Sequence, residues 1–514
     1  MNQLERLTAG DIVHLAPEIT LVITAVVLSL IDLALPRSVS RNFLGWLALV
    51  GTAVSAAFVL GDIAALNPSG AEQQATAISL LGNSWRVDDF ANLFKLLFLG
   101  GTALILLMSI GNVKESEIPH TGEYYYLFLP ATLGAMVMAS SGDLITLFVG
   151  LELLSITSYV LVGMRKKIYA SSEAAFKYVV TGGISSAIIL YGMSFLYGMS
   201  GSTNIAVINQ SLSANYASFE PLIYMAFFLL LAGFGFKIAA APFHMWAPDV
   251  YEGAPNPVTA YLAVVSKAAG VAITFRVLYD LFGYRGLFEQ PIHTDVLAAI
   301  GALAAAAMIV GNFIALRQTN MKRMLAYSGI ANAGYLLVPI GTHFGMVHYS
   351  NFSEMFFYLI AYMFMNIGAI AVFMAVSNAA KSENISAFAG LYYRAPGLAI
   401  AMVILILSLA GLPVTGGFFG KLYIMLGTLQ MQHYWLAAIM IGTSVVSFYY
   451  YFGVIRQMFM RSEADETAVK ATLTNSITIW ICVAATLLTG FFPHVVLRFI
   501  ESVFSLQNDL FLGM

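Results

Sequence analysis

Long apolar runs separated by short polar loops repeat along the whole chain, and this pattern predicts a bundle of membrane-spanning helices. A helix needs about 20 mostly apolar residues to cross the hydrocarbon core of a bilayer. Suitable runs lie near residues 12–35, 43–66, 90–111, 124–141, 143–164, 172–198, 221–250, 256–280, 295–316, 322–341, 352–377, 397–431, 434–458 and 474–497. The sequence therefore predicts an all-α polytopic membrane protein with about 14 spans.

Two of these runs are too long for one uninterrupted span and contain helix-breaking residues. The seventh carries Pro242 after Lys237, and the twelfth carries Gly411 and Pro413 before Lys421. Proline removes a backbone donor and breaks a helix, and the exposed backbone groups are tolerated at membrane depth where they line a wet cavity. Because the broken spans lie five spans apart, we expect two five-helix repeats, spans 4 to 8 and spans 9 to 13, with the second inverted.

This organisation divides the chain into four parts. We expect an N-terminal three-helix segment at 1–123, a first antiporter-like repeat at 124–280, an inverted second repeat at 281–460, and a C-terminal helix with an amphipathic tail at 461–514. The polar connection between the second and third spans, residues 67–89, is expected to form a small hairpin over the surface.

Composition agrees with a membrane protein and excludes several other classes. Of the residues, 59% are hydrophobic and only 10% are charged, whereas soluble domains carry about 25% charged residues. The net charge of -3 is small and scattered, so nothing indicates a nucleic acid partner. A single cysteine, Cys482, is too few for an iron–sulfur cluster or a disulfide. We therefore expect no cofactor and no metal bound by this chain.

Basic residues outside the spans gather on one side of the predicted membrane. Loops that follow odd-numbered spans hold Arg37, Arg41, Lys114, Arg165, Lys166, Lys167, Arg317, Lys322, Arg323, Lys381, Arg394, Arg456, Arg461 and Lys470. The other side, which includes both termini, holds only Arg6, Arg86, Arg285 and Arg498. Because Lys and Arg accumulate in cytoplasmic loops, both termini are expected on the non-cytoplasmic side.

Five ionisable residues lie inside apolar runs and are the main indication of function: Lys177, Lys237, Lys267, Lys421 and Glu152. A charge at the bilayer centre costs about 2.5 to 3.5 kcal/mol even on the lenient insertion scale. A lysine in apolar surroundings tends to lose its proton, and a nearby carboxylate favours keeping it. Glu152 beside Lys237 would hold that lysine charged, and separating them would push the proton towards Lys267 and then Lys421. The set predicts a proton relay.

Each of these residues also has a structural interpretation. Glu152 could form a buried ion pair between two helices. Lys237 or Lys267 could hold helices together by donating hydrogen bonds to backbone carbonyls. Lys421 fits a side chain that reaches the membrane surface, and Lys177 has Glu173 one turn earlier for an ion pair.

Three further ionisable residues lie at a helix break or near the ends of spans. His244 lies in the polar break of the seventh span. It could act as a titratable group between Lys237 and Lys267, or it could simply form a hydrogen bond at the helix break. Lys95 and Arg276 lie near span ends, where long side chains reach water, and Arg276 has Asp280 four residues on. We expect these two to be interfacial anchors.

Several segments resemble one known family. KIAAAPFHMWAPDVYEGAPNPVTAYLAVVSK, residues 237–267, resembles the seventh and eighth helices of the antiporter-like subunits of respiratory complex I and of related cation/proton antiporters. Its PDVYEGAPNPV portion looks like the N-type subunit, also called subunit 2. GLELLSITSYVLVG around Glu152 and GLPVTGGFFGKLYI around Lys421 extend the likeness. The M-type subunit carries a glutamate on its twelfth helix where this chain has Lys421. The loops, including TNMKRMLAYSGIANAGYLL, look most like those of subunit 2 of the photosynthetic NAD(P)H dehydrogenase-like (NDH-1) complex of cyanobacteria and chloroplasts.

The resemblance implies a proton-translocating subunit of an NAD(P)H (or ferredoxin)-plastoquinone oxidoreductase in a thylakoid membrane, with both termini on the lumenal side. It implies that the iron–sulfur clusters and plastoquinone are bound by other subunits of the complex. The expected partners are these other membrane and hydrophilic subunits, including neighbouring antiporter-like subunits, together with lipids. Family roles in proton transfer carry over to Glu152, Lys237, Lys267 and Lys421, with Lys177 and His244 as supporting positions. A stand-alone cation/proton antiporter and a non-pumping scaffold subunit remain open alternatives.

Overall fold

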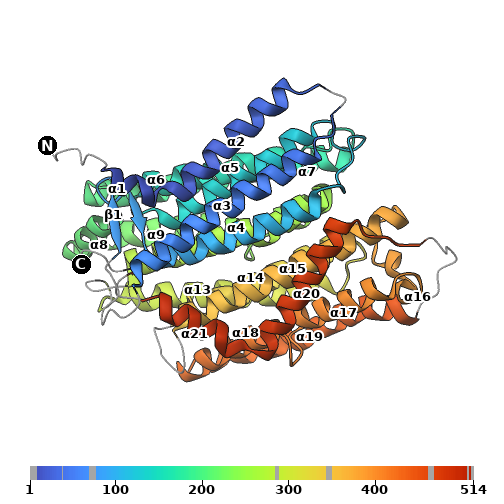
Figure 1. Ribbon diagram of the computed structural model, residues 1–514. Helices are drawn as coiled ribbons and strands as arrows, with labels where there is room; N and C mark the ends of the chain where they lie inside the picture. The colour runs from blue at the N-terminus through green and yellow to red at the C-terminus, as the bar shows by residue number, and fades with distance from the viewer. Residues whose placement is uncertain are drawn as a thin grey trace.

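The computed structural model describes residues 8–36, 39–68, 77–283, 287, 289–342, 350–460, 468–505 and 509–510 of the 514-residue chain. Long helices run side by side along one axis and form an elongated bundle (Figure 1). Its first half contains α1 Ala9–His14, α2 Ala16–Ala34, α3 Asn42–Leu66, α4 Asp89–Ser109, α5 Thr121–Ser140, α6 Leu144–Val162, α7 Tyr169–Ser200, α8 Ile205–Ala214, α9 Tyr216–Ile238, α10 Trp246–Gly253, α11 Asn256–Tyr261, the π-helix η1 Leu262–Ser266, α12 Lys267–Leu278 and the π-helix η2 Tyr279–Gly283.

The second half of the bundle continues with further helices. It contains α13 Pro291–Ala315, α14 Met321–Leu337, α15 Asn351–Ala380, the 3-10 helix η4 Ile385–Phe388, α16 Leu391–Arg394, α17 Pro396–Ala410, α18 Gly416–Gln430, α19 Tyr434–Met460, α20 Leu473–Phe491 and α21 Pro493–Val503.

The all-α architecture predicted from the apolar runs is confirmed. Within the described residues, 11 helices are long and apolar enough to cross a membrane. The other predicted spans fall on α5, on α14 and on the α17–α18 pair. Helical segments thus occupy every predicted span, while the number of membrane crossings itself stays a prediction.

Both predicted helix breaks are present. Ala239, directly after α9, has a left-handed backbone with φ of 61°, and Gly411, directly after α17, has φ of 87°. A left-handed residue ends a helix, and glycine adopts this conformation without strain. The chain resumes as α10 and as α18, so two interrupted segments lie next to Lys237 and Lys421.

The predicted hairpin is also present, and it is not laid over the surface. Strands β1 Ile78–Leu80 and β2 Trp85–Val87 pair antiparallel, with Leu80 opposite Trp85. All three residues of β2 are buried. In Figure 1 the hairpin lies at the same end of the bundle as α1 and α8, which we call the hairpin end. The opposite end, which holds α16 and the basic loop 163–168 between α6 and α7, is the basic end.

The centre of the bundle is formed by α4, the continuous α11–η1–α12 segment and α15, whose residues are mostly buried. Gly101 of α4 shows how closely they pack, because a Cβ there would lie 3.0 Å from Val265 and 3.5 Å from Met363. Outer helices such as α2, α7 and α19 expose apolar side chains, for example Leu33 and Phe176. Charged residues that point into the packing of these central helices are therefore buried.

Candidate functional site

Lys237 occupies the last turn of α9, directly before the first helix break. Its side chain is buried, and its Nζ donates a hydrogen bond to Ser155 Oγ at 2.9 Å. Ser155 lies one turn after Glu152 on α6, so the lysine and the carboxylate are neighbours, as the sequence predicted. They are not in direct contact in the described structure, and Glu152 Oε1 is buried without a hydrogen-bond partner.

Lys267 begins α12, directly after the π-helical turn η1. Its Nζ donates to the backbone carbonyl of Gly329 on α14, and it lies 5.6 Å from the ring centroid of Tyr362. An aromatic face stabilises an ammonium at this range. The stem of Lys237 packs against the same helix, because a Cβ at Gly270 would lie 3.2 Å from Lys237 Cγ. The fold thus brings Lys237 and Lys267, two of the lysines predicted to carry protons, to one helix.

Lys421 lies in α18 and reaches back across the second helix break. Its Nζ donates to the carbonyls of Leu409 at 2.9 Å and Ala410 at 3.3 Å, the last two residues of α17. Carbonyls at a helix C-terminus lack partners within the helix and carry partial negative charge. The ring of Tyr335 lies 4.8 Å from the ammonium. Lys421 is buried and does not reach the membrane surface.

A polar network that the sequence reasoning missed lies between Lys267 and Lys421. The Tyr358 hydroxyl donates to Asn332 Oδ1 at 2.5 Å, and Asn332 Nδ2 donates to Ser328 Oγ at 3.4 Å. Ser328 in turn contacts the hydroxyl of Tyr451. The signal was present as polar residues three to four apart, at Ser328, Asn332 and Tyr335 on α14 and at Tyr358 and Tyr362 on α15, a spacing that places side chains on one helix face.

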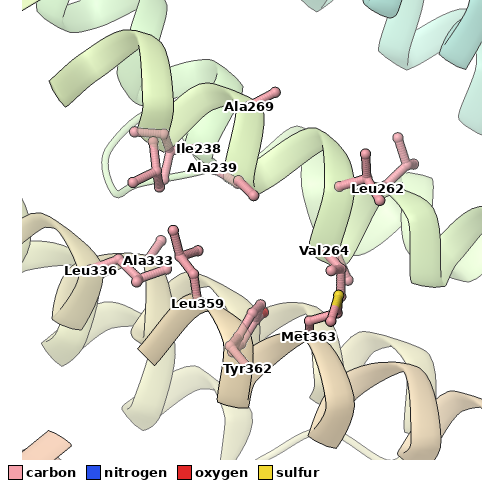
Figure 2. Close-up of a cluster of buried hydrophobic side chains, with 14 of the residues drawn as sticks. Ile238, Ala239, Leu262, Val264, Ala269, Ala333, Leu336, Leu359, Tyr362 and Met363 are labelled. Atoms are coloured by element: carbon pink, nitrogen blue, oxygen red, sulfur yellow. The ribbon is translucent and has the colours of Figure 1, made fainter. Parts of the chain in front are cut away.

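Apolar side chains fill the space between α9 and the pair α14 and α15. Figure 2 shows Ile238 of α9 facing Ala333 and Leu336 of α14 and Leu359 of α15, with Tyr362 beside them. These side chains are almost completely buried. Ions cannot cross such a dry layer cheaply, whereas a proton can pass between fixed polar groups and a few water molecules.

The structure does not bring Lys177 to this centre. It is 41% exposed and forms the predicted ion pair with Glu173 at 2.8 Å, together with a second one with Asp249 at 2.6 Å. Asp249 also accepts from Arg323 at 2.6 Å. Lys177 is therefore part of an ion-pair cluster and not an isolated buried charge.

His244 lies in the first helix break, where the sequence placed it. Its Nδ1 is buried without a hydrogen-bond partner, and its ring faces Tyr327 at 6.4 Å between centroids. In the described part of the chain it has no hydrogen bond to Lys237 or Lys267. A bridge through His244 would need water on both sides.

The expectation that Lys95 and Arg276 are interfacial anchors is wrong. Lys95 is fully buried and pairs with Glu18 at 2.9 Å. Arg276 is fully buried and pairs with Asp88 at 2.6 Å, not with Asp280. Their partners lie on other helices, so neither could be found from residues in the same turn.

Other charged residues were also misplaced. Arg86, assigned to a surface connection, is fully buried and pairs with Asp280 at 3.0 Å. The structure also buries two acidic residues that the sequence analysis did not single out, Glu18 in the first turn of α2 and Glu354 in the first turn of α15. The described residues contain no group of three His, Cys, Asp or Glu side chains that could hold a metal ion.

Comparison with known proteins decides the family. Residues 141–447 match the family described as NADH:quinone oxidoreductase/Mrp antiporter, TM. The chain belongs to this family. It is 51% identical to the NADH-quinone oxidoreductase subunit N of Paenibacillus sp. strain JDR-2 over 519 residues, covering 99% of this chain and 100% of that protein.

Solved structures agree with this assignment. A chain of respiratory complex I from Thermus thermophilus with bound aureothin has a TM-score of 0.75 and 30% identity, covering 94% of this chain and 98% of that one. A chain of the Mrp complex from Dietzia sp. DQ12-45-1b has a TM-score of 0.81 at 18% identity, covering 97% of each chain, and so shares the fold.

These comparisons confirm the resemblance to N-type subunits and the integral membrane character of the chain. The narrower resemblance to the photosynthetic complex is not supported, because the relatives are bacterial NADH-quinone oxidoreductase subunits N. The thylakoid location and the use of plastoquinone that followed from it are likewise unsupported.

Proposed function

We propose that this chain is the N-type, proton-translocating membrane subunit of a bacterial NADH-quinone oxidoreductase, a complex I. The observation that carries the proposal is how Lys237, Lys267 and Lys421 are held: all three are buried, and each donates only to a hydroxyl or carbonyl oxygen. A buried lysine without a carboxylate partner is poised between its charged and neutral forms. Such groups can accept a proton and pass it on.

In the proposed relay, protons move between Glu152 and Lys237, then to Lys267, and then to Lys421. The order follows the contacts, since Lys237 donates to Ser155, one turn after Glu152 on α6, and the stem of Lys237 packs on the helix that begins with Lys267. The hydroxyls and amide of Tyr358, Asn332 and Ser328, together with water, would complete the path to Lys421.

Lys177 and His244 have supporting roles in this proposal. Lys177 and Asp249 form a half-exposed ion pair outside the central network, where protonation can follow the aqueous phase. His244 lies in the helix break next to α9, with one ring nitrogen unoccupied by any protein partner. Histidine changes its charge near neutral pH, which suits a group that passes protons on.

The driving energy comes from other subunits. Moving one charge against a membrane potential costs about 2.3 kcal/mol per 100 mV. With a single cysteine, this chain cannot ligate the iron–sulfur clusters that carry electrons from NADH to quinone. The relative's name, NADH-quinone oxidoreductase subunit N, supports assembly with redox and antiporter-like subunits.

The bacterial relatives favour the plasma membrane as the location, and the distribution of basic loops favours both termini outside the cytoplasm. The division into two inverted repeats, 124–280 and 281–460, is part of the proposal. It is supported by a broken helix in each half and by similar glycine contacts. A Cβ at Gly134 of α5 would lie 2.5 Å from the backbone of α6, and one at Gly311 of α13 would lie 2.5 Å from the backbone of α14.

Replacement of Lys267 by methionine in the intact complex tests the proposal. The complex is reconstituted in liposomes, and the rate of NADH oxidation by quinone is measured together with the proton gradient. Loss of a proton-transfer group slows transfer by about 100-fold or more, so Lys267→Met should lower the protons pumped per NADH to what the remaining subunits supply. Lys166→Met, in the exposed basic loop, is the control and should pump normally.

Two outcomes would favour the alternatives. If assembled Lys267→Met complex pumps as well as the wild type, the chain is a scaffold. If the isolated chain exchanges Na⁺ or K⁺ for protons without NADH or quinone, it is a stand-alone antiporter, a function that the shared fold with the Mrp chain permits.

A further inference from the structure

Glu354 is a buried carboxyl group that the relay described above does not use. It lies in the first turn of α15, and only 5% of its surface is exposed. Within the described parts of the chain, no basic side chain pairs with it and no side chain hydrogen-bonds to its carboxylate. An isolated buried carboxylate is costly, so a carboxyl group in this position readily carries a proton.

Glu354 is the end of a polar stripe along α15. Tyr358 and Tyr362 follow at intervals of four residues, which places all three side chains on one face of the helix, about 6 Å apart along its axis. Tyr362 faces the Lys267 ammonium, and Tyr358 donates to Asn332. The stripe therefore leads from the centre of the relay towards the hairpin end.

The helix that carries Lys421 is shaped to receive this stripe. A Cβ at Gly420, next to Lys421, would lie 2.4 Å from the Tyr358 ring, and a Cβ at Gly427 would lie 2.6 Å from Glu354 Oε2. Residues with side chains would collide at both positions. The Glu354 carboxyl group thus rests against bare backbone two turns beyond Lys421.

A second carboxylate lies on the outer side of Glu354. Glu501 of α21 is partly exposed, and its Oε1 accepts from the Ser350 backbone N–H at 2.8 Å and from Ser350 Oγ at 3.0 Å, at the start of α15. Glu501 is near enough to Glu354 for their charges to repel. Two close carboxylates resist being ionised together, so a proton on one is easily shared with the other. This pair connects a buried position to a partly exposed one.

We infer that Glu354 is the group that exchanges protons between the lysine relay and the hairpin-end surface, with Glu501 as its partner at that surface. The inference rests on the proposed function and adds the end of the path. In the transfer, the Lys421 ammonium gives up its proton and becomes a neutral amine, and the Glu354 carboxylate becomes a carboxylic acid. Passing that proton to Glu501 or to water restores the carboxylate.

The test compares variants of the intact complex in liposomes, with NADH oxidation and the proton gradient measured together. Glu354→Gln keeps the size of the side chain and removes its ability to carry a proton. We expect it to lose as many pumped protons per NADH as Lys267→Met loses, and the double variant to lose no more. Glu354→Asp should restore pumping in part. Glu123→Gln, a half-exposed carboxylate in the first turn of α5, is the matched control and should pump normally.

The outcomes separate the inference from the proposed function. If Lys267→Met lowers pumping and Glu354→Gln does not, Glu354 is not on the path and this inference is overturned, whereas the proposed function stands. If neither lowers pumping, the proposed function itself fails. Should Glu354→Gln not assemble, Gly427→Ala provides the second test, because its methyl group displaces the carboxyl group. It should lower pumping, while Gly442→Ala, which has open space at its Cβ, should not.

Discussion

Two regions of the bundle bury charge in opposite ways. At the hairpin end, Arg86 pairs with Asp280 and Arg276 pairs with Asp88, and all four side chains are completely buried. In the proposed relay, buried lysines donate to neutral oxygens and have no carboxylate in contact. The first arrangement locks both charges in place, and the second leaves the proton free to move.

The difference follows from what each partner can do. A carboxylate in contact with a buried arginine stabilises the charged form of both groups, and arginine does not lose its proton in proteins. A carbonyl or hydroxyl oxygen stabilises an ammonium only modestly, so burial brings the charged and neutral forms of a lysine closer in free energy. Burial of a charge therefore does not by itself indicate proton transfer, and the kind of partner decides.

The largest expected effect comes from breaking a hairpin-end pair. Asp88→Ala would leave Arg276 charged and buried without a partner, which costs about 3–5 kcal/mol. It would also remove the cap of α4, since Asp88 Oδ1 accepts from the Ala91 N–H at 2.7 Å, at a further cost of about 1 kcal/mol. We expect little assembled complex and a clear fall in thermal stability, measured by heating the purified subunit in detergent or the complex in membranes.

Lys421→Met is the matched comparison for this prediction. It removes a buried charge that has no ion-pair partner, so stability should stay within about 1 kcal/mol of the wild type, while pumping falls to what the remaining subunits supply. Equal destabilisation by both variants would show that the two regions do not differ in the way described here.

A smaller effect is expected from crowding the relay without changing any charge. A Cβ at Gly329 would lie 3.0 Å from Lys267 Nζ and 3.2 Å from the Tyr362 hydroxyl. Gly329→Ala should push the ammonium away from its carbonyl and slow proton transfer on the order of tenfold, because such transfer depends on sub-ångström placement. Gly183→Ala, with nothing within 4 Å of the added Cβ, is the control. Normal pumping by the Gly329 variant would mean that Lys267 does not work from this position.

The positions of the helices and of the buried lysines could be predicted because both depend on local sequence. Apolar runs of membrane length identify the helices, and Pro242 and Gly411 identify the breaks. The lysines stand out because each interrupts an apolar run.

The partners of the charges could not be predicted from the same information. Arg276 pairs with Asp88, which lies 188 residues away in the chain, although Asp280 is only four residues away. Pairing across helices depends on which faces meet in the folded bundle, and helix spacing rules describe only one helix at a time. For this reason Lys95 and Arg276 looked like anchors, and the role of Glu354 was not visible until α15, α18 and α21 were placed together.

The smallest expected effect is a change with pH at the hairpin end, where Asp509 joins Asp88 and Asp89. Burial raises the pKa of the Asp509 carboxyl group well above its ordinary value, and the charges of Asp88 and Asp89 raise it further. Because its pKa is higher in the folded state, the protonated Asp509 carboxyl group stabilises the fold, and this stabilisation is complete at pH values below the unfolded-state pKa of about 3.9. This contribution is lost as pH rises through the folded value. Above the folded-state pKa the wild type therefore carries a buried negative charge that an asparagine would not.

Asp509→Asn should accordingly gain stability relative to the wild type as the pH is raised through the folded-state pKa of Asp509. The pH trend is the informative quantity, because Asp509 also accepts from the Asp89 N–H at 2.9 Å and the Ser505 N–H at 2.8 Å. Asparagine can replace only one of those acceptors well, which lowers stability at every pH. Thermal unfolding of both proteins over a pH series measures the trend. If the stability of both proteins changes with pH in the same way, the pKa of Asp509 is not raised by folding. The hairpin end would then be less shielded from water than its buried arginine–aspartate pairs imply.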